Sequence, residues 1–190
     1  YVRQQEPMGL GHAVWCARDI VGDEPFAVLL ADDFMVGAPG CLKQMVEAYN
    51  RTGGNMICAQ EVADDQTDKY GVITPGTRDG RLTEVLGLVE KPAPGTAPSN
   101  LAVIGRYILQ PEVMRVLETQ EKGAGGEIQL TDAMARMIGN QPFHGRTFDG
   151  TRYDCGDKAG FIQANLALAL DRPDIGPAVR SFARALLGRD

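Results

Sequence analysis

The chain has 190 residues, 44% of them hydrophobic and 23% charged, and its formal net charge is −6. This composition is that of an ordinary globular protein with a sizeable core, and the shortage of basic residues disfavours nucleic acid as a partner. The sequence has no apolar run long enough to span a bilayer and no signal peptide, so we expect no membrane partner and a cytoplasmic location. The four cysteines form no Cys-x-x-Cys pair, which argues against a zinc site.

The first third of the chain predicts alternating helices and strands. A glycine-rich turn leads into apolar residues with helical spacing, and a second amphipathic segment follows. Between and after them lie two short apolar runs with almost no alternation, as expected for strands buried on both faces. The expected helices cover residues 9–21 and 39–51, and the expected strands cover 26–31 and 55–60. This order favours a parallel sheet covered by helices, which is an α/β fold.

The middle of the chain is richer in strands, and its end is helical. Glycine- and proline-rich turns separate three expected strands, and a proline-rich irregular loop covers 91–98. Asp157 is the expected cap of the third of four late helices. The strands are expected over 70–73, 82–85 and 101–108, and the helices over 111–120, 133–138, 158–170 and 178–187.

Two adjacent carboxylates, Asp32 and Asp33, follow the strand expected over 26–31. Ligands of open α/β sheets bind beyond the carboxyl ends of strands. Magnesium prefers one or two carboxylates together with substrate phosphates. By itself the run leaves two interpretations open: a metal site for phosphate chemistry, or one acid that caps the next element beside another that is solvated.

Seven short runs spread over nearly the whole chain show a family resemblance when taken together and in order. They are RQQEPMGLGHA (3–13), LADD (30–33), YGVI (70–73), VEKP (89–92), PSNLA (98–102), GEIQLTD (126–132) and YDCGDK (153–158). The chain thereby resembles the nucleotidyltransferase family of sugar-nucleotide pyrophosphorylases, in its bacterial UTP–glucose-1-phosphate uridylyltransferase branch.

The resemblance implies a reaction, a fold and a domain organisation. The reaction is Mg²⁺-dependent transfer from UTP to glucose 1-phosphate, which yields UDP-glucose and pyrophosphate, and family members form homo-oligomers. The implied fold is Rossmann-like α/β: a mixed, mostly parallel central sheet flanked by helices, with a small β-rich sugar-binding portion. We expect a single nucleotidyltransferase domain over 1–190, with the remainder of the nucleotide-binding half at 1–66, a sugar-binding half at 67–175 and a C-terminal helix at 176–190.

The resemblance also assigns metal ligands and a base-binding segment. Asp32 and Asp154 match the two aspartates that bind the metal in the family and are the expected catalytic acids, whereas Asp33 is expected to support the loop. Gln4 and Gly9 match positions that recognise uracil. An amide can both donate to and accept from a pyrimidine edge, and glycine lets a base lie close to the backbone.

The resemblance assigns the binding of the sugar phosphate to four residues. Lys91 would hold the sugar phosphate as a compact point charge and counts as catalytic, and Glu90 would accept hydrogen bonds from sugar hydroxyls. Gly71 would let the sugar ring approach the backbone, and Asn100 would add a hydroxyl contact. Read without the resemblance, the Glu90–Lys91 pair is an exposed acid–base pair at a strand end.

The chain departs from the family pattern in two places. Ala31 stands where the family usually has proline, and nothing matches the glycine-rich signature, with its Arg and Lys, that cradles the nucleotide phosphates. We therefore expect an N-terminally truncated domain with little activity by itself. Three alternatives stay open: a thymidylyl- or adenylyl-transferring relative, a metal-dependent glycosyltransferase, and a non-catalytic nucleotide-sugar-binding paralogue.

Overall fold

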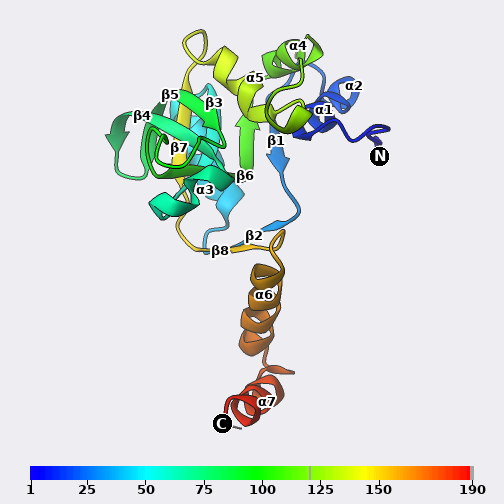
Figure 1. Ribbon diagram of the computed structural model, residues 1–190, viewed down its shortest axis with the longest axis vertical. Helices are drawn as coiled ribbons and strands as arrows, with labels where there is room; N and C mark the ends of the chain where they lie inside the picture. Colours follow the sequence, from blue (N-terminus) through cyan, green and yellow to red (C-terminus); the bar gives the residue numbers. More distant parts are fainter. Residues whose placement is uncertain (120, 189–190) are drawn as a thin grey trace. The chain divides into compact units, whose positions relative to one another are not determined.

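The structure, a computed structural model, describes residues 1–119 and 121–188 and divides into two compact units (Figure 1). The larger unit comprises Tyr1–Leu29 and Pro39–Asp149, and the smaller comprises Leu30–Ala38 and Gly150–Asp190. The larger unit holds a six-stranded sheet with helices, and the smaller holds a two-stranded ribbon with two helices. The combination of helices with a central mixed sheet confirms the predicted α/β class.

The sheet of the larger unit has the strand order β1-β6-β3-β7-β5-β4. Long strands lie at its centre and in a hairpin at one side, and a short strand, β1, forms the other edge. The bounds are β1 Phe26–Leu29, β3 Asn55–Glu61, β4 Gly71–Asp79, β5 Leu82–Glu90, β6 Leu101–Leu109 and β7 Phe143–Thr147.

The predicted, mostly parallel pairing needs a correction. Among the strands of the described residues, β3 and β7 pair in parallel, whereas β1–β6, β3–β6, β4–β5, β4–β6 and β5–β7 are antiparallel. The sequence order suggested that β1 and β3 are neighbours, but β6 lies between them and runs against both. The long strand β6 is buried along almost its whole length, and it has a neighbouring strand on each edge. The strand β7, over 143–147, was not predicted.

The first strand also differs from the prediction. It covers Phe26–Leu29 rather than 26–31, and its residues alternate between half-buried and exposed. Leu29 exposes half of its side chain. The strand is an edge strand with one covered face, so the expectation that both of its faces are buried is wrong.

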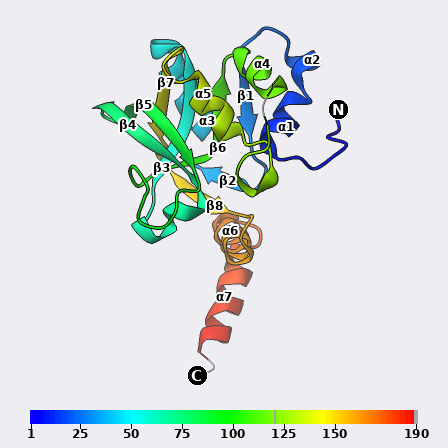
Figure 2. The ribbon, with the colours of Figure 1, turned by 45° about the horizontal axis from the view of Figure 1, so that its top comes forward.

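Helices pack around this sheet and complete the core. Helix α3 packs against β3 and β6, and α5 packs against β5. Helices α1, α4 and α5 contact one another at the β1 side of the sheet (Figure 2). The helices are α1 Leu10–Trp15, α2 Arg18–Val21, α3 Cys41–Thr52, α4 Glu112–Glu118 and α5 Leu130–Met137, with 3-10 turns η1 Asp64–Lys69 and η2 Ala124–Gly126. The helix predicted over 111–120 ended at Gln120, which lies outside the described residues.

A pair of free thiols lies in this core. Cys41 opens α3 and Cys58 lies within β3, and their Sγ atoms are 3.4 Å apart. The hydrogen bond with Cys41 and the burial of the thiol both raise the pKa of Cys58. Both residues therefore behave as small core residues.

The smaller unit is built on strands β2 (Asp33–Val36) and β8 (Thr151–Asp154), which pair antiparallel. Helix α6 (Lys158–Asp171) follows β8, and its predicted cap is confirmed, because the Asp157 carboxylate accepts a hydrogen bond from the Gly160 N–H at 2.9 Å. Helix α7 (Gly176–Leu187) packs against α6. In the described part of the chain, every helix is too short or too polar to cross a membrane.

Candidate active site

The ribbon of the smaller unit brings Asp32 and Asp154 together. Asp33 and Asp154 face each other in the β2–β8 register, and the Cys155 N–H donates to the Asp32 carbonyl oxygen at 2.8 Å. A Cβ atom on Gly156 would lie 3.1 Å from Asp32 Oδ2 and 3.2 Å from Asp154 Oδ1. The two carboxylates therefore border the same small space, although 122 positions separate them in the sequence (154 minus 32).

The donor set at this space fits a hard divalent cation. Asp32 is exposed and Asp154 is half-buried, so solvent and a ligand can reach both. The residues within 1–119 and 121–188 form no group of three or more acidic, histidine or cysteine side chains suited to a metal. Two carboxylates with water and substrate oxygens are the ligand set that Mg²⁺ prefers, whereas an all-protein cage is not required.

Arg152 is a third member of this group, and the sequence reasoning missed it. Its Nε donates to Asp33 Oδ1, and its Nη2 donates to Asp154 Oδ2 at 3.2 Å. The side chains of Arg152 and Asp33 are 10% and 9% exposed. Asp33 is thus committed to the buried ion pair, while Asp154 accepts from Arg152 at Oδ2 and from the Gly156 N–H at Oδ1, at 3.1 Å. No sequence signal pointed to Arg152, because β8 was not predicted as a strand; within that strand, alternation places Arg152 and Asp154 on one face.

Gln4 and Gly9 form a second group, in the larger unit. Gln4 Nε2 donates to the Gly9 carbonyl oxygen at 3.0 Å and lies 2.9 Å from His12 Nδ1. The amide nitrogen is thus engaged within the chain, and in the described structure the amide oxygen of Gln4 carries no hydrogen bond. That oxygen can accept a hydrogen bond from an N–H of a base. His12 holds the amide in place.

Gly9 also has a packing reason to be glycine. Its φ is +101°, and a Cβ there would lie 2.7 Å from Glu127 Cβ and 2.8 Å from the Ile128 carbonyl oxygen. The Met8 carbonyl accepts a hydrogen bond from the Ile128 N–H at 2.7 Å, so this turn is tied to 127–128. Contact between Gly9 and a base stays a prediction.

Gly71, Glu90 and Lys91 form a third group, at one end of the β4–β5 hairpin. Gly71 pairs with Glu90, and a Cβ on Gly71 would lie 3.1 Å from Glu90 Oε2 and 3.2 Å from Thr131 Oγ1. Lys91 is exposed, has a φ of +44°, and donates its backbone N–H to the Tyr70 carbonyl at 3.0 Å. Among the described non-glycine residues only Lys91 has a positive φ, and such strain is concentrated at functional positions. The sequence reasoning did not single out Thr131.

Asn100 immediately precedes strand β6 of the larger unit. It lines a cavity of about 290 Å³ whose other residues include Asp64 and Gly95, and neither Glu90 nor Lys91 contributes to that cavity. Its carbonyl oxygen accepts a hydrogen bond from the Val62 N–H at 3.0 Å. The side chain of Asn100 is exposed, and its contact with a sugar hydroxyl stays a prediction.

Residues 1–170 match the family model described as nucleotidyl transferase. The chain belongs to the nucleotidyl transferase family. This match includes all three residue groups described above, so membership extends over both the acid pair of the smaller unit and the candidate ligand-binding residues of the larger one.

Individual relatives are similar to this chain in sequence as well as in fold. The chain is 47% identical over 190 residues to a UTP–glucose-1-phosphate uridylyltransferase of Bacillus subtilis, covering all of this chain and 65% of the relative. A crystal structure of UDP-glucose pyrophosphorylase complexed with UDP-glucose matches with a TM-score of 0.88 and 41% identity, covering 90% of this chain and 66% of that one. A UTP-bound UGPase from Acinetobacter baumannii matches with a TM-score of 0.84 and 37% identity, covering 100% and 65%. The chain spans 65% of the length of the Bacillus subtilis relative.

Proposed function

We propose that the protein containing this chain is a UTP–glucose-1-phosphate uridylyltransferase. The observation that carries the proposal is the 47% identity to a relative of that name across the whole chain. The site geometry supports it, because Asp32 and Asp154 border one space in the smaller unit, and Gly71, Glu90 and Lys91 lie together at one end of the β4–β5 hairpin. The solved relatives that bind UDP-glucose and UTP support the same substrate class.

In the proposed reaction a phosphate oxygen of glucose 1-phosphate attacks the α-phosphorus of UTP, the new P–O bond forms, and pyrophosphate leaves. Such chemistry requires positioning and charge neutralisation more than covalent help from the protein. The exposed ammonium of Lys91 would hold the phosphate of the sugar, and Glu90 would accept from sugar hydroxyls. The unused amide oxygen of Gln4 would accept from the uracil N–H.

Asp32 and Asp154 are the residues that would hold a magnesium ion. When bound, the ion supplies charge neutralisation for the crowded phosphates. Arg152 holds Oδ2 of Asp154 and the Gly156 N–H holds Oδ1, which fixes the carboxylate at the space it borders with Asp32. The residues at this space therefore fit the metal that the proposed reaction uses.

The test is a side-by-side assay of the intact protein with glucose 1-phosphate, Mg²⁺ and each of UTP, dTTP, ATP and CTP. We expect UTP to give the highest rate and to release one pyrophosphate for each UDP-glucose formed. Preference for dTTP or ATP would favour a thymidylyl- or adenylyltransferase, and release of free UDP would favour a glycosyltransferase. Binding of UDP-glucose with no turnover of any nucleotide would favour a non-catalytic paralogue.

We also propose self-association through the two helices of the smaller unit and a cytoplasmic location. Large apolar side chains are exposed on both α6 and α7, among them Phe161, Ile162, Phe182 and Leu187. Exposed apolar surface of this kind marks interaction sites. All four cysteines are free, as in a reducing compartment. Sedimentation should show an oligomer that Phe182→Asp dissociates, and cell fractionation tests the location.

A further inference from the structure

An arginine-lined cavity lies at the opposite end of the β4–β5 hairpin from the candidate sugar-binding residues. Gly71 pairs with Glu90 at one end of the hairpin, and Asp79 pairs with Leu82 at the other. The cavity measures about 520 Å³, and the residues that line it are Arg51, Thr52, Asp79, Gly80, Arg81, Leu82 and Arg146. This volume lies in the range of small-molecule sites, which is roughly 300–1,000 Å³.

Three separate elements bring the arginines to this cavity. Arg51 lies in the last turn of α3, Arg81 immediately precedes β5, and Arg146 lies in β7. The chain as a whole carries a net charge of −6, so three guanidinium groups around one cavity stand out against the overall balance. A local positive site of this kind is what an acidic protein needs in order to attract an anion.

Two of the three guanidinium groups have no carboxylate bound to them in the described structure. Arg51 forms no ion pair with a described residue. Arg146 donates only to neutral oxygens, the Thr147 carbonyl and, at 3.5 Å, Gln44 Oε1. Burial lowers the pKa of Arg146, and the nearby Arg81 and Arg51 lower it further. An anion in the cavity would relieve this repulsion.

The acidic residues around the cavity neutralise only part of the positive charge of the arginines. Arg81 pairs with Asp149 at 3.1 Å, but the two side chains are 49% and 68% exposed. Exposed pairs contribute little, so an anion can compete for Arg81. Asp79 is exposed and lines the rim.

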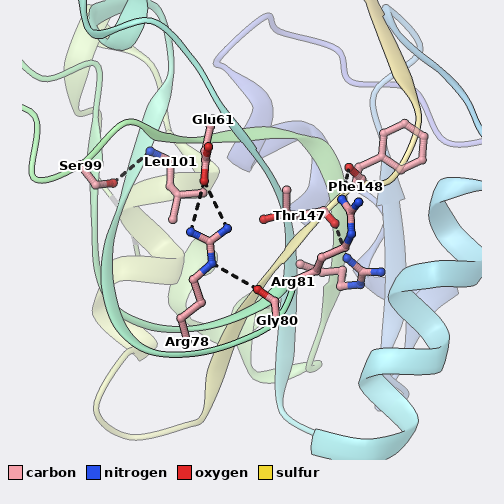
Figure 3. Close-up of polar contacts among 9 residues, drawn as sticks. Glu61, Arg78, Gly80, Arg81, Ser99, Leu101, Thr147 and Phe148 are labelled. Atoms are coloured by element: carbon pink, nitrogen blue, oxygen red, sulfur yellow. Dashed lines mark hydrogen bonds and ion pairs between the residues drawn. The ribbon is translucent and has the colours of Figure 1, made fainter.

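A fourth arginine nearby is already engaged. Figure 3 shows Arg78 turned towards Glu61 and the Gly80 carbonyl, each at 3.2 Å, whereas Arg81 lies beside Thr147 and Phe148. Arg81 donates to the Phe148 carbonyl at 3.4 Å. Arg78 does not line the cavity, which leaves Arg51, Arg81 and Arg146 as its cationic donors.

We propose that this cavity binds a phosphorylated small molecule through its phosphate group, with Arg51, Arg81 and Arg146 as the donors. A guanidinium group presents parallel N–H donors that match two phosphate oxygens, which a Lys ammonium cannot do. The remaining volume accommodates the rest of a small metabolite. The site is separate from the residues proposed to act on UTP and glucose 1-phosphate.

The test is calorimetric titration of the full chain with inorganic phosphate and with pyrophosphate, at an ionic strength held constant with chloride. We expect saturable binding that Arg51→Gln weakens at least about tenfold, because a charge-assisted hydrogen bond is lost. Lys43→Gln is the matched control: it removes the same charge from an exposed position on the same helix and should leave the affinity unchanged.

A second variant separates this cavity from the candidate active site. Lys91→Gln should leave the affinity of the Arg51-dependent phosphate site unchanged, although it removes phosphate binding that Lys91 supports in the candidate active site. If Lys91→Gln abolishes binding while Arg51→Gln does not, the ligand occupies the candidate active site and the proposal is wrong. Binding that never saturates, or that Arg51→Gln and Lys43→Gln weaken equally, also contradicts it. Circular dichroism confirms that each variant is folded.

Discussion

Replacing Arg152 with methionine should destabilise the smaller unit substantially. The substitution removes the guanidinium from the buried Asp33 carboxylate and from one oxygen of Asp154, and it keeps most of the side-chain volume. Breaking a buried ion pair by removing one partner costs about 3–5 kcal/mol. We apply this range to the Arg152–Asp33 pair, because both of its side chains are about nine-tenths buried. Asp154, whose side chain is 39% exposed, adds less to the loss than Asp33 does.

Thermal and denaturant unfolding, followed by far-UV circular dichroism, measure this loss. In a chain of this size each kcal/mol lowers the melting temperature by roughly 2–4 °C, so the expected decrease is about 6–20 °C. Arg172→Met is the matched control, because Arg172 also pairs with an aspartate in the smaller unit, at 2.6 Å, but in an exposed position. We expect the control to unfold almost like the unmodified chain.

The double variant Asp33→Asn, Arg152→Met sharpens the test. It removes the buried charge together with its partner, so it should recover part of the stability that Arg152→Met loses. If Arg152→Met unfolds at the same temperature as Arg172→Met, the pair contributes no more than an exposed one, and the account of the β2–β8 ribbon is refuted.

The remaining predictions concern two glycines and the thiol pair. Gly71→Ala should raise the KM for glucose 1-phosphate, measured by pyrophosphate release, because the new Cβ lies 3.1 Å from Glu90 Oε2; an unchanged KM would contradict the proposed sugar contact. Gly160→Ala should lower the free energy of unfolding by about 1–3 kcal/mol, since its Cβ would overlap the backbone carbonyl oxygen of Asp154. Gly40→Ala, where a Cβ meets open space, is the control in the same unfolding assay. Cys58 should resist iodoacetamide at pH 8 in the folded chain, because the Cys41 hydrogen bond and burial raise its pKa and keep the thiol protonated. Mass spectrometry measures the order of labelling, and labelling of Cys58 before the half-buried Cys16 and Cys155 would contradict this prediction.

Local sequence signals predicted the elements that local interactions determine. The helix expected over 158–170 is α6, Lys158–Asp171, and its cap at Asp157 forms as predicted. Capping depends on residues three positions apart, so the sequence alone contains the necessary information. The strand expected over 101–108 is likewise β6, Leu101–Leu109, because a long apolar run has few alternatives in a folded chain.

Long-range pairing was not predictable in the same way. The insertion of β6 between β1 and β3 depends on strands far apart in the sequence. The ribbon strands β2 and β8 have four residues each and no marked alternation, so neither shows in the sequence. The pairing of Asp33 with Arg152, 119 positions apart, follows from that ribbon. The sequence resemblance placed Asp32 and Asp154 in one site, but the residue that orients Asp154 appeared only in the structure.

The most direct test of the proposed function is the Mg²⁺-dependent rate of UDP-glucose formation by the intact protein and by its Asp32→Asn variant. The substitution keeps the shape of the side chain and removes the charge that would hold the metal. We predict that the unmodified protein forms UDP-glucose and pyrophosphate in equal amounts, and that Asp32→Asn lowers the rate by about 100-fold or more, since metal neutralisation supplies several kcal/mol. Equal rates for the two proteins, or a rate independent of Mg²⁺, would contradict the assignment of Asp32 and the mechanism built on it.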